Sequence, residues 1–233
     1  MNQTHQPTPP CPLCLASETN LCWEQTQGVN WSLYGKALDS LCFFRCEKCA
    51  LIFKDPQLQL APERERARYE THQNNPDDPA YLRFLNRLAA PLMEKVGKTQ
   101  VGLDFGCGPT SAMAGIFEST GRPCVSYDPF FFNDRSLLEQ RYDFISCSEA
   151  AEHFHHPAEE FMRLFSCLKP GGWLGVMTQP VPPDFAAWWY HRDPTHVSFY
   201  SPETFAWIAK TYRATAVPIG SDVVLFQQSE TNE

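Results

Sequence analysis

The sequence contains no apolar run close to the roughly 20 residues that a membrane-spanning helix needs, and Phe130-Phe131-Phe132 is only a short cluster. Its start lacks the basic and then apolar pattern of a secretory signal. Internal repeats and low-complexity tracts are also missing. These absences predict a globular protein of the cytoplasm that has no membrane partner.

Positive charge is scarce in the second half of the chain. Residues 101–233 hold 8 Lys and Arg against 16 Asp and Glu, whereas the first 100 residues hold 11 of each. An acidic half repels a phosphate backbone, so the composition argues against nucleic acid as a partner.

The length of 233 residues suits one sizeable domain and one small domain. From Val101 onward, strand and helix patterns alternate, which is typical of a mostly parallel sheet with helices on both faces. The fold class is therefore predicted as α/β, a doubly wound and Rossmann-like sheet, preceded by a small ribbon. The expected parts are a zinc-binding ribbon over residues 1–60, a helical connector over 61–98 and the α/β domain over 99–233. Strands are expected over 101–105, 124–127, 142–147, 173–178, 214–218 and 223–227, and helices over 110–120, 157–168 and 202–212, with Pro91 expected to kink or restart a connector helix.

Six of the ten cysteines lie within the first 49 residues. In a reducing compartment, paired short spacings indicate metal ligands rather than disulfides. Two C-x2-C units place four thiolates together, which is the ligand set of a structural zinc site. We therefore expect zinc bound by Cys11, Cys14, Cys46 and Cys49, with Cys42 as an alternative to Cys46 and unmetallated thiols as the alternative to zinc.

Two glycines lie between a predicted strand and a predicted helix, in the segment VGLDFGCGPT of residues 101–110. Gly106 and Gly108 allow a ligand to approach the backbone closely, and the helix start offers N–H groups to an anion. Asp128 ends the next strand, where its carboxylate can accept hydrogen bonds from both hydroxyls of a ribose. Taken alone, these glycines also fit a ligand-free turn or a dinucleotide site.

Further residues separate these alternatives. Asp104 precedes the glycines, the segment Ser148–His153 follows the third strand, and Lys169-Pro170-Gly171-Gly172 leads into the fourth. Together they resemble the class I S-adenosylmethionine-dependent methyltransferases over residues 101–228. The resemblance implies S-adenosylmethionine as cofactor, held by Asp104, Phe105, Gly106, Gly108, Asp128, Ser148 and Glu149.

One departure from that family lies between Asp128 and Asp143. The 14 residues there are too few for the helix and strand that the family has at this point. The acidic residue that would contact adenine has no clear equivalent, so Phe130, Phe131 or Leu137 are the candidates to pack the adenine instead.

An acceptor that must lose a proton during methyl transfer needs a base, and a histidine is suited to that role. His153 ends the segment expected beside the methyl group, and His196 lies in an aromatic-rich segment that also contains His191. We expect His153 or His196 to be the catalytic base, with structural hydrogen bonding as the alternative. Metal binding by His153, His155 and His156 is less favoured than solvated loop histidines.

The predicted function is methyl transfer from S-adenosylmethionine to a small-molecule acceptor. Two alternatives are a non-catalytic module that only binds S-adenosylmethionine, and an RNA methyltransferase that docks through the ribbon. The near-neutral ribbon, with 4 Lys and Arg against 5 Asp and Glu in residues 1–60, weakens the second alternative. The sequence predicts no oligomeric state.

Overall fold

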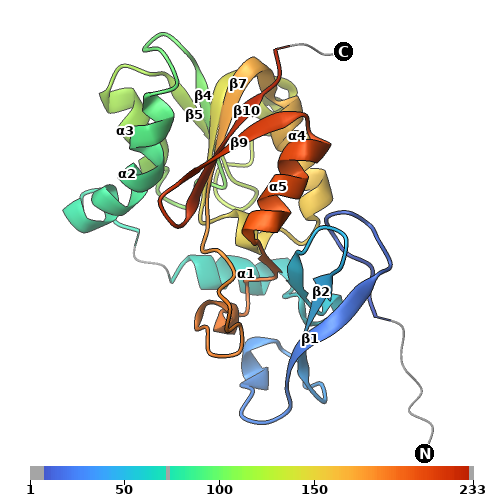
Figure 1. Cartoon of the computed structure of the whole chain (residues 1–233). Coiled ribbons are helices and arrows are strands. Elements are labelled where there is room, and N and C mark those ends of the chain that lie inside the picture. Colours follow the sequence, from blue (N-terminus) through green and yellow to red (C-terminus); the bar gives the residue numbers. More distant parts are fainter. Residues whose placement is uncertain (1–7, 72–73, 231–233) are drawn as a thin grey trace, which may run out of the picture.

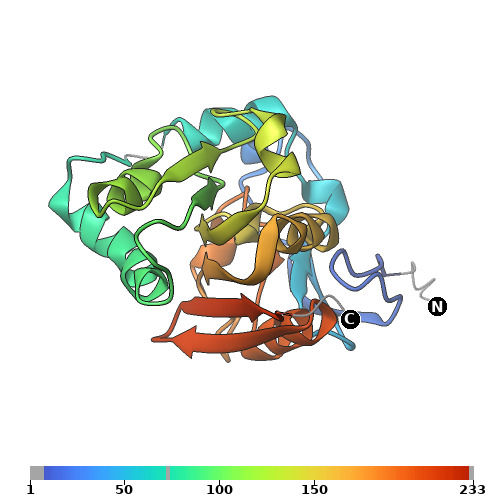
Figure 2. The ribbon, with the colours of Figure 1, turned by 90° about the horizontal axis from the view of Figure 1, so that it is seen from above.

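A computed structural model describes residues 8–71 and 74–230. Its larger sheet has the strand order β5-β4-β6-β7-β10-β9 (Figures 1 and 2). β5, β4, β6 and β7 are parallel, whereas β10 runs antiparallel to both β7 and β9. This arrangement confirms the predicted mostly parallel α/β sheet. The strands are β4 (Gly102–Phe105), β5 (Cys124–Tyr127), β6 (Tyr142–Ser148), β7 (Leu168–Met177), β9 (Ala214–Ile219) and β10 (Val223–Gln228).

Helices cover both faces of this sheet. α2 (Pro79–Met93) and α3 (Ala112–Ser119) lie on one face, and α4 (Pro157–Ser166) and α5 (Pro202–Thr211) lie on the other (Figure 1). α2 begins where Asp78 accepts a hydrogen bond from the Ala80 N–H, and its buried Leu85, Leu88 and Leu92 recur at helical spacing. The helix continues past Pro91 to Met93, so that proline does not restart it.

Two parts of the larger sheet are unusual: the start of β7 and the segment between β5 and β6. β7 begins at Leu168, earlier than predicted, because Leu168 pairs with Tyr142 before an irregularity in the register. Residues 129–141 hold only the 3-10 helix η3 (Arg135–Glu139) and one isolated bridge, from Asp128 to Phe132. This segment therefore supplies neither a strand nor an α-helix, as its short length predicts, and β5 is an edge strand.

The N-terminal ribbon forms a second, smaller sheet. β1 (Thr19–Gln25), β2 (Leu41–Cys46) and β3 (Ile52–Lys54) are antiparallel neighbours, and β8 (Ser198–Phe199) pairs with β3 as a fourth strand. The strand β8 comes from the segment between β7 and α5, far along the chain. Pairing of β8 with β3 therefore joins the ribbon to the α/β part of the molecule.

The ribbon also shares its apolar core with the rest of the chain. Phe43 of β2 packs with Tyr190 and Phe199 in one buried cluster, and Phe53 of β3 packs with Phe161 of α4 in another. α1 (Pro62–Tyr69) leads from the ribbon and runs between the two sheets (Figure 1). Among the described residues, no helix combines the length and apolar character needed to cross a membrane.

Candidate functional site

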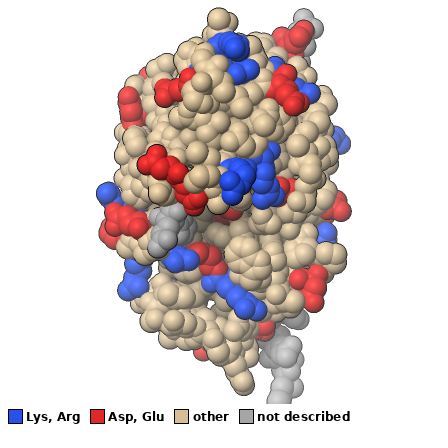
Figure 3. All heavy atoms as spheres, turned by 90° about the vertical axis from the view of Figure 1, so that its left-hand side faces the viewer, with Lys and Arg blue, Asp and Glu red and all other residues tan. Residues whose placement is uncertain are grey.

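A cleft of about 670 Å³ lies at the carboxyl ends of β4, β5 and β6. Its walls come from the loop after β4, the turn after β5, the segment after β6, and helices α1 and α2. Figure 3 shows a hollow in the middle of one face of the molecule, with acidic and basic side chains near its rim. Ligands of open α/β sheets bind at this end of the strands.

The predicted glycine loop forms one wall of the cleft. Gly106 has a φ of +73°, and a Cβ added there would lie 2.5 Å from the Cβ of Ala150. Gly108 has a φ of +64° and faces open space. Because both conformations are rarely adopted by residues with a side chain, the backbone favours glycine at both positions, and at Gly106 the contact with Ala150 adds to that preference.

Asp128 faces this loop from the end of β5. Its carboxylate accepts hydrogen bonds from the backbone N–H groups of Gly108 at 3.0 Å, Phe130 at 2.8 Å and Phe131 at 3.1 Å. These bonds fix the carboxylate at the cleft wall, with Phe130 and Phe131 beside it. A carboxylate held in this way still has lone pairs available for the hydroxyls of a ligand.

Ser148 and Glu149 follow β6 and also line the cleft. The Oγ of Ser148 and the Oε1 of Glu149 are buried and have no hydrogen-bond partner among the described residues. Glu149 has a φ of +48°, a strained conformation that is common at functional sites. Burial, and then the charge of Glu152, raises the pKa of Glu149 to about 9. Unpartnered polar atoms in a strained turn indicate a place where a ligand binds.

Asp104 lies beneath the loop, and it is not among the residues that line the cleft. Its Oδ1 accepts a hydrogen bond of 2.9 Å from Ser146, while its Oδ2 is buried without a partner. Burial raises the pKa of Asp104 to about 7, against the lowering effect of Ser146. Phe105, by contrast, lines the cleft directly. A direct contact between Asp104 and the cofactor stays a prediction.

His153 and His196 also line the cleft and lie next to each other. Their rings are 4.8 Å apart, and each Nδ1 faces a backbone carbonyl, Thr195 O at 3.0 Å and Tyr190 O at 2.8 Å. A carbonyl only accepts, so each ring donates from Nδ1, and in its neutral form each ring has a lone pair on Nε2. Burial is the main cause that lowers the pKa of His196.

Glu152 also lines the cleft. Its side chain is 1% exposed, and its Oε1 accepts a hydrogen bond from the hydroxyl of Tyr190. Its Oε2 is buried without a partner among the described residues. The sequence segment that contains Glu152 is recognisable, but its proximity to His196, within 4.8 Å, is not, because His196 lies 44 positions further along the chain.

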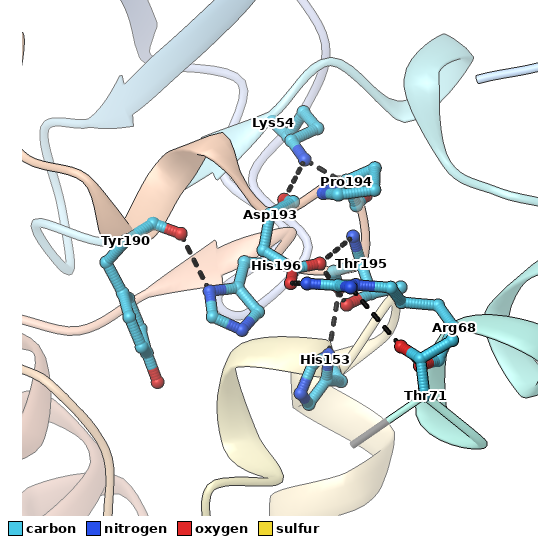
Figure 4. A network of polar contacts seen from close by, with 9 residues as sticks. All are labelled: Lys54, Arg68, Thr71, His153, Tyr190, Asp193, Pro194, Thr195 and His196. Atoms are coloured by element: carbon cyan, nitrogen blue, oxygen red, sulfur yellow. Dashed lines mark hydrogen bonds and ion pairs between the residues drawn. The ribbon is translucent and has the colours of Figure 1, made fainter. Parts of the chain in front are cut away.

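The turn that carries His196 is held by residues from the N-terminal part of the chain (Figure 4). Lys54 of β3 is buried, and its Nζ donates to the carbonyls of Asp193 and Pro194, both at 3.0 Å. Arg68 of α1 forms an ion pair of 2.7 Å with the carboxylate of Asp193. Sequence reasoning missed both residues, since no local pattern links them to the turn.

α1 supplies further cleft residues that the sequence did not reveal. The ring of Tyr69 lies edge-on to the ring of His153, with centroids 5.1 Å apart. Glu65 contacts the Nε2 of His155 at 2.8 Å. His155 and His156 line the cleft, whereas His191 packs among Trp23, Phe43 and Phe185, where burial lowers its pKa to about 4.

The four predicted zinc ligands come together at the end of the ribbon. The Sγ atoms of Cys11 and Cys49 are 3.5 Å apart, and those of Cys14 and Cys46 are 3.4 Å apart. All four lie within 4.8 Å of one another. Thiolates around a tetrahedral zinc ion are separated by about 3.8 Å, so donor type and spacing both fit zinc. Cys42 is not part of this group.

Comparison with known proteins gives a consistent result. A family model described as a methyltransferase domain matches residues 71–215. No curated protein matches the chain significantly by sequence.

Solved structures share the fold at low sequence identity. The 1,6-didemethyltoxoflavin-N1-methyltransferase of Burkholderia thailandensis, solved with 1,6-didemethyltoxoflavin and S-adenosylhomocysteine, has a TM-score of 0.52 at 13% identity, over 81% of this chain and 96% of that one. An O-methyltransferase family protein of the same organism has a TM-score of 0.51 at 14% identity, over 72% of this chain. The match spans 64% of that protein's length.

Proposed function

This chain belongs to the methyltransferase-domain family, and from that premise we propose that it methylates a small-molecule acceptor in the cleft at the carboxyl ends of β4, β5 and β6. The match over residues 71–215 confirms the class I S-adenosylmethionine-dependent methyltransferase that the sequence predicts. The match includes α2, which the sequence places in the connector.

The observation that carries this proposal is the glycine loop opposite Asp128. Gly108 leaves open space at the cleft wall, and the Asp128 carboxylate is fixed by three backbone N–H groups. A ribose hydroxyl would find its acceptor there, and the unpartnered Ser148 Oγ and Glu149 Oε1 would bind other polar atoms of the cofactor. When bound, S-adenosylmethionine supplies a methyl group on a positively charged sulfur atom.

The acceptor would bind at the end of the cleft formed by Glu152, His153 and His196. Both histidines direct Nδ1 at a backbone carbonyl and keep a lone pair on Nε2. The low pKa of His196, caused mainly by burial, keeps its ring neutral at physiological pH. We therefore assign both histidines to assisting loss of the acceptor's proton.

A small molecule fits this site better than RNA does. The ribbon buries Phe43, Ile52 and Phe53 against the rest of the chain, so those residues are not free to dock another molecule. The α/β half is acidic, which opposes binding of a phosphate backbone. A zinc ion bound by all four cysteines would have no open coordination position, which favours a structural role for it. Reduced thiolates of this kind fit the cytoplasm.

Methyl transfer is tested by incubating the protein with methyl-labelled S-adenosylmethionine and either a small-molecule extract or total RNA. We expect label in the small-molecule extract, none in RNA, and strongly reduced label in the extract with the Asp128→Asn variant at a low concentration of S-adenosylmethionine. Binding of S-adenosylhomocysteine in a calorimeter without labelled product would instead indicate a non-catalytic module. Label in RNA would show that the ribbon or the cleft accepts nucleic acid.

A further inference from the structure

Three potential metal ligands meet at the acceptor end of the cleft. Glu152, His153 and His196 each offer one ligand atom, and these atoms lie within 4.8 Å of one another. Glu152 and His153 belong to the 3-10 helix η4 (Ala151–His153) after β6, and His196 belongs to the turn before β8. All three line the cleft, so a cation bound there would be accessible to an acceptor.

The hydrogen bonds of the two histidines prepare them for coordination. Each ring donates from Nδ1 to a backbone carbonyl, Thr195 O or Tyr190 O, which leaves the Nε2 lone pair free (Figure 4). A second bond of this kind, from the ring N–H to a carbonyl, accompanies nearly every metal-ligating histidine because it fixes the tautomer and the ring orientation.

Glu152 gives independent evidence for a missing partner. Its side chain is almost completely buried, and its Oε2 makes no hydrogen bond with any described residue. The nearby cations are already engaged, since Lys54 donates to two carbonyls and Arg68 pairs with Asp193. A buried carboxylate oxygen without a partner is costly, and a cation at this position would satisfy it.

We propose that Glu152, His153 and His196 bind a divalent transition-metal ion such as Zn²⁺, Fe²⁺ or Mn²⁺. Two imidazoles and one carboxylate are a ligand set typical of these ions, and three protein ligands leave coordination positions open toward the cleft. This assignment rests on the proposed function: those positions would bind a hydroxyl oxygen of the acceptor, and the two histidines would assist loss of its proton as ligands of the ion and not as bases. Coordination lowers the pKa of such a hydroxyl, and its proton then passes to water in the open cleft.

The site is tested with Mn²⁺ by electron paramagnetic resonance, on the full chain purified with zinc and without S-adenosylmethionine. The signal of free Mn²⁺ should decrease when wild-type protein is added. Glu152→Gln keeps the size of the side chain and an acceptor for Tyr190, and His196→Gln removes one imidazole. Each variant should weaken Mn²⁺ binding at least about tenfold.

His156→Gln is the matched control, because His156 lines the same cleft but is exposed and lies outside the three-residue cluster. It should bind Mn²⁺ as the wild type does. A Co²⁺ spectrum of wild-type protein gives a second readout, because nitrogen and oxygen ligands produce no thiolate charge-transfer band.

Absence of Mn²⁺ and Co²⁺ binding to the wild type would overturn the proposal, and so would binding that survives both substitutions. S-adenosylhomocysteine binding is measured in parallel by calorimetry. Protein that binds Mn²⁺ but not S-adenosylhomocysteine would contradict the proposed function and leave the metal site standing.

Discussion

Asp128→Asn is the substitution that tests the cofactor site most directly. The carboxylate uses Oδ1 to accept from Phe130 and Phe131 N–H, and Oδ2 to accept from Gly108 N–H. Asparagine has one acceptor oxygen, so its amide group would have to face at least one of these N–H donors. The variant therefore lacks both the charge that attracts ribose hydroxyls and the bond that fixes the glycine loop.

The size of the effect follows from these contacts. A hydrogen bond to a charged group contributes about 1.5–3 kcal/mol. Asparagine retains part of the interaction with two hydroxyls, so we expect a loss of about 2–4 kcal/mol in binding S-adenosylhomocysteine. This loss corresponds to an affinity that is lower by roughly 30- to 700-fold. Isothermal titration calorimetry measures it without knowledge of the acceptor.

Asp134→Asn is the control for this experiment. Asp134 caps the nearby 3-10 helix η3 by accepting from Ser136, and it does not line the cleft. It should bind S-adenosylhomocysteine as tightly as the wild type. If Asp128→Asn melts at the same temperature as the wild type and binds within threefold of it, the assignment of Asp128 to the ribose is refuted.

Three further predictions concern the loop, the ribbon and a buried acid. Gly106→Ala should lower the affinity for S-adenosylhomocysteine more than about tenfold, because alanine would have to adopt a left-handed backbone conformation, which costs about 1–2 kcal/mol, and its Cβ would meet Ala150. Gly121→Ala is the control, since Gly121 has a φ of +81° but open space around it, and this variant should bind S-adenosylhomocysteine normally in the same calorimeter. Cys49→Ser should lower the zinc content below about one ion per chain, which a chelating dye measures after the protein is unfolded. Cys22 is exposed and lies outside the cluster, so Cys22→Ser should keep the wild-type zinc content. Equal zinc contents in the two variants would contradict the predicted zinc site. Burial raises the pKa of Asp104 to about 7, so between about pH 4 and pH 7 the unfolded chain loses a proton that the folded chain keeps. Asp104 therefore lowers the free energy of unfolding by at most about 4 kcal/mol as pH rises through this range, and Glu149, whose pKa is also raised, adds a change of the same sign. Denaturant titrations of Asp104→Asn should show a shallower slope than the wild type, and an unchanged slope would exclude a contribution from Asp104.

Features that depend on a local pattern could be predicted from the amino-acid sequence. The two C-x2-C units, the glycines between a strand and a helix, and Asp128 at the end of the next strand are each readable within a few residues. Most strands and helices of the larger sheet lie within a few residues of their predicted bounds, because periodic burial and capping act over the same short range. Even the shortened segment between β5 and β6 follows from counting residues.

The contribution of the N-terminal part to the site could not be predicted from the sequence and depends on how the two sheets pack. β8 is two residues long, too short for any periodicity, yet it pairs with β3 from the other end of the chain. This pairing brings Lys54 to the turn of His196, and α1 brings Arg68 to the same turn and Tyr69 to the cleft. Such contacts join residues more than 80 positions apart, so their partners become defined only when the apolar surfaces of both sheets are buried together.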